Sequence, residues 1–159
     1  YKVAKILESA YGPRMRVAPI LGKAAYEGIL GKKTGRGFYI HKGKKKIPNP
    51  KIYDLIKNFA PKNISGESAT KRMVYAMVNE AARCLEENVA DRPDTIDIGM
   101  IMGTGFPPFR AGLLRYADSI GIDNIVRDLK GFERELKAGR FAPCKYLTDK
   151  AGKTKNFYG

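Results

Sequence analysis

The stretch Lys71-Arg-Met-Val-Tyr-Ala-Met-Val-Asn-Glu-Ala-Ala-Arg-Cys-Leu-Glu-Glu87 decides the fold class of this chain of 159 residues. It holds neither Gly nor Pro, and its apolar residues recur at helical spacing, so one face can turn toward a core. The residues expected on that face are Met73, Met77, Cys84 and Leu85. Ser68 lies just before the run and can cap its start. A long amphipathic helix is therefore expected from about Ser68.

The flanking sequence also favours helices. Gly12 and Gly121 fit helix ends, and Pro19 fits a helix start. Helices are expected over about residues 3–10, 19–28, 51–59, 94–102, 112–120 and 123–138, with a last short one near residue 143. Residues 31–39 and the basic stretch 41–50 are expected as loops, residues 60–67 as a linker and residues 103–108 as a break. The predicted fold class is all-α.

Positive charge is concentrated in the first third of the chain. Residues 1–62 hold 15 Lys and Arg against three carboxylates, a net charge of +12, whereas residues 63–159 hold 15 against 13. This balance favours a polyanionic partner: nucleic acid, a membrane surface, a phosphorylated ligand such as CoA, or an acidic domain. A solvated face is the simpler alternative. Nucleic acid is the least expected partner, because no aromatic platform is interleaved among Lys42, Lys44, Lys45 and Lys46.

A weak internal repeat divides the chain. Arg16-Val-Ala-Pro19 recurs as Arg140-Phe-Ala-Pro143, and Lys33-Thr34 with Phe38-Tyr39 recurs as Lys153-Thr154 with Phe157-Tyr158. The repeat predicts two tandem copies of one helical unit. Residues 1–62 would be the tail of the first copy plus the basic loop, and residues 63–159 the second copy. Chance coincidence is the alternative.

The glycine-rich segments do not match nucleotide-binding motifs. Gly31-Lys32 is followed by Lys33 where a Walker motif needs Ser or Thr, and position 26, where that motif needs Gly, is Tyr. The pattern GxGxxG fails at Ile40 and at Pro108, and no strand-like run precedes either attempt. A dinucleotide site within this chain is therefore not expected.

Metal-binding and catalytic constellations are not expected either. His41 is the single histidine, and Cys84 and Cys144 are the two cysteines, so a zinc site or a His-based triad has too few members. The two thiols fit a reducing compartment and are expected as small buried residues. Asp94 and Asp97 lie three residues apart on one helix, where pairing with its N-terminal dipole is the expected role.

Three segments resemble the C-terminal domain of the 3-hydroxyacyl-CoA dehydrogenases. The first is Gly28–Tyr39, which is similar to the end of a domain copy. The others are Val78–Ala81 with Asp97–Gly99, and GTGFPPFRAG at Gly103–Gly112 with Arg115–Asp118 and Gly121. Their order and spacing also resemble the family, whose multifunctional α-subunits carry this domain twice in tandem. The resemblance covers nearly the whole chain.

The resemblance implies a parent enzyme whose chemistry lies elsewhere. Such α-subunits join an enoyl-CoA hydratase to an NAD-dependent L-3-hydroxyacyl-CoA dehydrogenase of fatty-acid β-oxidation. The family's His–Glu pair, its Ser and its NAD site belong to a Rossmann domain absent from this chain. Its assisting Asn falls before Tyr1 in the first copy and aligns with Lys71 in the second. Asn79 occupies a different position and is not a catalytic candidate.

We therefore expect a scaffold that covers a cleft and contacts other domains, with no catalytic, cofactor or metal residue of its own. Lys32, Lys33 and Arg36 are the candidate ligand contacts, toward CoA phosphates or a neighbouring domain. Expected partners are acyl-CoA, the protein's own Rossmann and hydratase domains, and a second copy or a thiolase subunit. No transmembrane segment is expected, and the location would be cytoplasmic in a bacterium or the mitochondrial matrix in a eukaryote. The alternative is a stand-alone basic helical binding module without enzymatic activity.

Overall fold

The computed structural model describes residues 1–57, 63–153 and 156–159. The chain divides into two compact units, Tyr1–Asn63 and Ile64–Gly159. Helices dominate both units, which confirms the all-α prediction apart from one small two-stranded sheet. Among the described helices, none combines the length and apolarity needed to cross a bilayer.

The first unit is built around a small apolar cluster. Its helices are α1 (Lys2–Tyr11), α2 (Pro19–Tyr26) and α3 (Lys51–Asp54), with 3-10 turns at Gly12–Met15 and Lys32–Thr34. Pro19 occupies the first turn of α2, as expected. Ala24, Ile29 and Ile52 are the buried residues of the cluster. Helix α3 is shorter than the expected helix 51–59, whose last two residues lie outside the described ranges, as do residues 60–62 of the expected linker.

The prediction of a loop over residues 41–50 is wrong. Strands β1 (Tyr39–Lys42) and β2 (Lys45–Pro48) pair antiparallel, with Gly43 at φ +58° in the turn between them. The strands Tyr39–Lys42 and Lys45–Pro48 lack the alternation of apolar and polar residues by which a strand is usually predicted, so the sequence pattern gave no sign of them. Asn49 anchors the hairpin: its side chain is buried and its Nδ2 donates to the Gly37 carbonyl at 2.8 Å.

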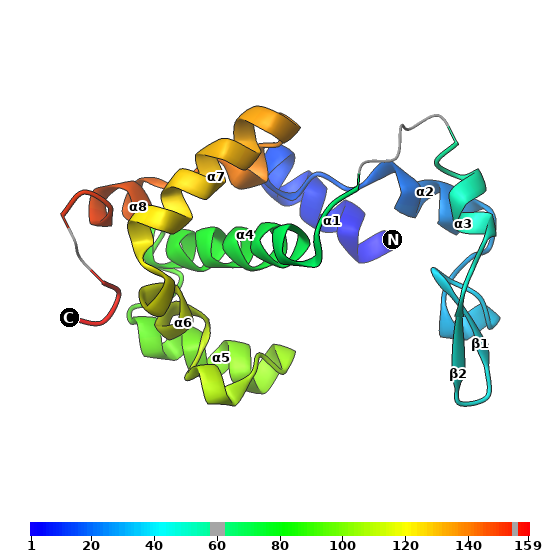
Figure 1. Ribbon diagram of the computed structural model, residues 1–159, viewed down its shortest axis with the longest axis horizontal. Helices are drawn as coiled ribbons and strands as arrows, with labels where there is room; N and C mark the ends of the chain where they lie inside the picture. The colour runs from blue at the N-terminus through cyan, green and yellow to red at the C-terminus, as the bar shows by residue number, and fades with distance from the viewer. Residues whose placement is uncertain (58–62, 154–155) are drawn as a thin grey trace. The chain divides into compact units, whose positions relative to one another are not determined.

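The second unit is a bundle arranged around α4 (Gly66–Glu86). In Figure 1, α7 (Ile122–Leu136) runs along one side of α4, while α5 (Pro93–Thr104) and α6 (Leu113–Ile120) lie on the other. Helix α8 (Lys145–Lys150) also packs on α4. The core is filled by fully buried aliphatic side chains: Val78, Leu113, Leu114, Ile125, Leu129 and Leu147.

Two details of the predicted long helix are wrong. Ser65 caps α4 by accepting a hydrogen bond from the Ser68 amide at 3.1 Å, so the helix begins three residues earlier than expected. Met73 is 63 % exposed instead of facing the core. The buried stripe runs through Tyr75 and Val78, and five residues of helix rotate Met73 about 140° away from Val78. The contacts of α4 with distant segments determine which face is buried, and the spacing of apolar residues along the helix does not specify those contacts.

Candidate functional site

Asp97 links three segments of the second unit. Its side chain is 3 % exposed, and its carboxylate accepts hydrogen bonds from the amides of Leu114 at 2.6 Å and Arg115 at 3.1 Å. It also accepts from the Tyr158 hydroxyl at 2.7 Å. Because the two amides belong to the first turn of α6, Asp97 satisfies donors that no intrahelical carbonyl can reach.

The expected role of Asp97 at its own helix dipole is therefore wrong. Asp97 lies beyond the first turn of α5, and its side chain reaches across to α6. Asp94 does lie in the first turn of α5, where it is paired with Arg92 and accepts from the Thr95 amide at 3.0 Å. Asp94 and Asp97 both lie on α5, but Asp94 binds at the N-terminus of α5 whereas Asp97 binds at the N-terminus of α6.

Gly112 permits the approach between α5 and α6. Its φ is +112°, a conformation that L side chains rarely adopt. A Cβ built there would lie 2.3 Å from Asp97 Cγ. Only Gly can therefore stand directly before Leu113 while Asp97 caps α6.

The C-terminal Phe-Tyr pair is held by a second carboxylate. Asp118 accepts hydrogen bonds from the amides of Phe157 at 2.8 Å and Tyr158 at 3.0 Å. The Arg115 guanidinium lies 3.5 Å from the centroid of the Tyr158 ring. Burial of the Tyr158 hydroxyl, helped by its hydrogen bond to Asp97, raises the pKa of that side chain. Asp97 and the RYAD residues Arg115 and Asp118 thus dock the end of the chain.

Asn79 performs a similar structural task on α4. It is 1 % exposed, its Nδ2 donates to the Ala142 carbonyl at 2.8 Å, and its Oδ1 accepts from the Cys144 amide at 2.9 Å. These bonds hold the segment before α8 against α4. Cys84 and Cys144 are thiols that form no disulfide, and burial raises the pKa of the Cys144 thiol. Sequence reasoning could not find the partners of Asn79, which lie more than 60 residues away.

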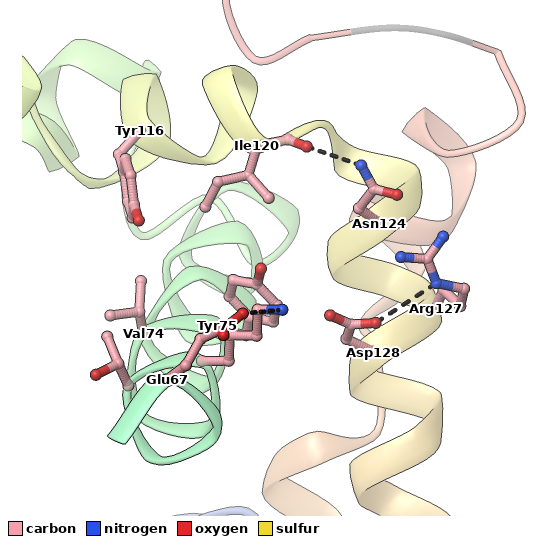
Figure 2. A pocket seen from close by; sticks show the side chains of 10 residues that line it. Glu67, Val74, Tyr75, Tyr116, Ile120, Asn124, Arg127 and Asp128 are labelled. Carbon is pink, nitrogen blue, oxygen red and sulfur yellow. Dashed lines mark hydrogen bonds and ion pairs between the residues drawn. The ribbon is translucent and has the colours of Figure 1, made fainter. Parts of the chain in front are cut away.

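A cleft of about 540 Å³ opens between α4, α6 and α7 (Figure 2). Its lining residues are Glu67, Thr70, Lys71, Val74, Tyr75, Tyr116, Ile120, Asn124, Arg127 and Asp128. Lys71 Nζ lies 2.9 Å from Glu67, and Arg127 Nε lies 3.5 Å from Asp128. Since each cation already has a carboxylate partner, the cleft offers a balanced polar surface without a strong charge. Its lining holds no His, Cys or Ser to serve as a nucleophile or neutral base.

Lys71 therefore lies at a cleft, while the loop candidates lie in the other unit. Lys32, Lys33 and Arg36 are exposed on a loop closed by a 2.9 Å hydrogen bond from the Gly31 amide to the Arg36 carbonyl. Gly37 is required there, because a Cβ would lie 2.7 Å from Gly31 Cα. The structure brings the three cations together on one short loop. That they contact a ligand stays a prediction.

The residues of this chain do not fit a dinucleotide. Such a site needs parallel strands and a helix that starts at the glycine-rich turn. Within the described ranges the named strands are β1 and β2, which are antiparallel, and the segment after Gly37 enters a strand instead of a helix. The described part of the chain therefore lacks the framework on which NAD would bind.

Fold and site together define a helical domain whose polar motif residues organise its own packing. The family model of the 3-hydroxyacyl-CoA dehydrogenase C-terminal domain matches residues 69–156. The chain belongs to this family, which confirms the resemblance carried by the GTGFPPFRAG and RYAD segments.

Relatives of known name share nearly the whole chain. The fatty acid oxidation complex subunit alpha of Vibrio vulnificus is 38 % identical over 157 residues, covering 99 % of this chain and 22 % of that protein. The subunit of the same name from Shewanella loihica is 38 % identical over 161 residues, with the same coverage. This chain thus spans about a fifth of the length of these relatives.

A solved structure shares the fold. The dehydrogenase part of multifunctional enzyme 1 from C. elegans superposes with a TM-score of 0.62 at 26 % identity. The match covers 93 % of this chain and 35 % of that one. The match therefore includes residues of both units, and this chain corresponds to about a third of the solved dehydrogenase part.

Proposed function

We propose that this chain is the C-terminal helical portion of a fatty-acid oxidation α-subunit, which joins an NAD-dependent L-3-hydroxyacyl-CoA dehydrogenase to an enoyl-CoA hydratase. The observation that carries the proposal is the alignment of 99 % of the chain with subunits of that name. Acyl-CoA and NAD would be bound in the full-length protein by domains outside these 159 residues. The described residues of this chain lack the parallel strands and helix on which NAD would bind, which supports an NAD site in another domain.

The proposed role of the second unit is to support the fold and to cover a cleft. Asp97, Asp118 and Asn79 are polar residues of the family-like segments, and each is already engaged with backbone groups of this unit. Asn79 and Asp97 are buried and Asp118 is partly buried, and their hydrogen bonds to the backbone of this unit support a structural role. We therefore assign no chemical step to these residues.

In the same proposal, residues 1–62 end a first copy of the domain and residues 63–159 form a second. The Phe-Tyr pairs support this. In the second unit the backbone partners of Asp118 and the side-chain partner of Asp97 lie 39 and 61 residues after them. At the same spacing, the carboxylates for Phe38 and Tyr39 would lie before Tyr1. The first copy would then contain the family's assisting Asn upstream, while Lys71 stands at that place in the second.

Two measurements test the assignment. A calorimetric titration of the 159-residue chain with NAD should show no saturable heat, and tight binding would overturn the placement of the cofactor site in another domain. Sequencing the gene upstream of the Tyr1 codon should show hydratase-like and Rossmann-like segments. A start codon next to Tyr1 would instead support a stand-alone basic module.

The loop of Lys32, Lys33 and Arg36 is proposed to contact CoA phosphates or a neighbouring domain of the full-length enzyme. Its three exposed cations and its closed backbone support a preformed anion contact. Changing all three to Ala in the full-length enzyme should lower either acyl-CoA affinity or subunit assembly. If both stay unchanged, the loop is a solvated surface.

A further inference from the structure

The hairpin of β1 and β2 lies in a stretch without any negative charge. Residues 28–53 contain eight Lys and Arg and no Asp or Glu. Four of the lysines belong to the strands and their turn: Lys42, Lys44, Lys45 and Lys46. A surface positive charge normally has carboxylates nearby that offset repulsion, and this segment supplies none from its own sequence.

The strand register increases that repulsion. Lys42 is directly opposite Lys45. Like charges in directly opposed positions destabilise a two-stranded pairing. The hairpin forms because other contacts hold its base: Asn49 binds the Gly37 and Phe38 carbonyls, and the His41 amide donates to the Gly35 carbonyl at 2.8 Å. A sequence that opposes its own local structure is a sign of function.

The shape of the hairpin favours a broad partner over a small anion. Strand β2 is exposed along its whole length, and Lys42 and Lys44 are exposed as well. Small ligands bind in concave sites that bury most of their surface. Four extended cations on an open two-stranded ribbon can instead meet many negative groups on a wide surface.

The residue types favour lipid over protein or nucleic acid. Protein interfaces are depleted in Lys, and specific recognition of nucleic acid uses Arg forks or stacked aromatic rings. The charged residues at the tip of this hairpin are all lysines, whose flexible stems suit the diffuse charge of anionic headgroups. Ile47, which is 45 % exposed, adds an apolar group on the same ribbon.

We propose that the hairpin, residues 39–48, docks on the anionic headgroups of a phospholipid bilayer. The lysines supply the attraction, and Ile47 enters the boundary between headgroups and acyl chains. The contact is peripheral and reversible. It does not depend on the enzymatic assignment, because the charge and geometry belong to this chain alone.

Vesicle flotation of the 159-residue chain tests the proposal. The chain should float with vesicles of phosphatidylcholine and phosphatidylglycerol, stay behind with pure phosphatidylcholine, and be released as salt rises. Each lysine near the surface contributes about fivefold in partitioning, so the pair of changes Lys42→Gln and Lys45→Gln should weaken binding on the order of 25-fold. The control pair Lys130→Gln and Lys153→Gln removes the same charge from the second unit and should change binding little.

A second variant separates binding from folding. Lys42→Glu places a carboxylate opposite Lys45, so the hairpin should become more protected against amide hydrogen exchange while vesicle binding falls. Equal loss of binding in the control pair would overturn the proposal, since net charge would then be the cause. Tighter binding to double-stranded DNA than to anionic vesicles at equal salt would overturn it in favour of nucleic acid, and unchanged flotation of the Lys42 and Lys45 variant would exclude the hairpin.

Discussion

The two Phe-Tyr pairs of this chain have the same sequence and opposite environments. Phe157 is 7 % exposed and its neighbour Tyr158 is bound by two carboxylates, whereas Phe38 and Tyr39 are about half exposed at 49 % and 50 %. The carboxylates that bind Phe157 and Tyr158 precede them in the same unit. No Asp or Glu occurs between residues 28 and 53 to serve Phe38 and Tyr39. The C-terminal pair is therefore held both by its carboxylate acceptors and by the burial of Phe157 in the core.

The strongest way to break the docked arrangement is Gly112→Ala. The new Cβ would meet Asp97 at 2.3 Å in a backbone conformation that L residues avoid. Steric clash and backbone strain should together lower the free energy of unfolding by about 4 kcal/mol in urea titrations followed by circular dichroism. Gly131→Ala in α7 is the control: nothing lies within 4 Å of its Cβ, so this change should stabilise the helix slightly. Equal destabilisation by both would contradict the role given to Gly112.

Truncating Phe157 and Phe38 to Ala tests the difference between the two Phe-Tyr pairs. Phe157→Ala should lower the free energy of unfolding by about 3 kcal/mol, because it empties a site in the core of the second unit. Phe38→Ala should change it by less than about 0.5 kcal/mol, as expected of an exposed side chain. Thermal unfolding of the two variants side by side measures the difference. A large loss from Phe38→Ala would mean that this pair already has a docking site.

Local sequence patterns predicted the helices, whereas the docking contacts were beyond their reach. Apolar periodicity, Gly at helix ends and Pro19 at a helix start are short-range signals, and they placed most elements. The bonds from Asp97 span 17 and 61 residues, and those from Asn79 span more than 60. Nothing in the spacing of one sequence encodes such pairings. The hairpin was missed because its strands, Tyr39–Lys42 and Lys45–Pro48, show no alternation of apolar and polar residues.

Removing one acceptor should loosen the docked pair by a smaller amount. Asp97→Ala leaves the Leu114 and Arg115 amides without their cap and the Tyr158 hydroxyl without its acceptor. We expect a loss of about 2 kcal/mol in the free energy of unfolding, with faster amide hydrogen exchange at Leu114. Asp94→Ala serves as the control, because Asp94 is solvent-accessible and caps only its own helix end. If Asp94→Ala destabilised the chain as much, the separate roles assigned to Asp94 and Asp97 would be contradicted.

The smallest expected effect is a loss of stability in alkali. The pKa of Tyr158 is raised in the folded chain by burial and by Asp97, so above pH 10 the unfolded chain releases this proton while the folded chain retains it. Stability from this group is therefore complete below about pH 10, the ordinary tyrosine pKa, and declines as the pH rises above that value.

The slope from one such group is less than about 1.4 kcal/mol per pH unit, since the Tyr158 side chain is partly accessible to solvent. Urea titrations between about pH 8 and about pH 11, the range in which tyrosine ionises, should show the decline. Tyr158→Phe should reduce the slope. Burial also raises the pKa of Tyr75 and Tyr146, so part of the decline should remain in that variant. An unchanged slope in the Tyr158→Phe variant would contradict the claim that docking keeps the Tyr158 hydroxyl protonated.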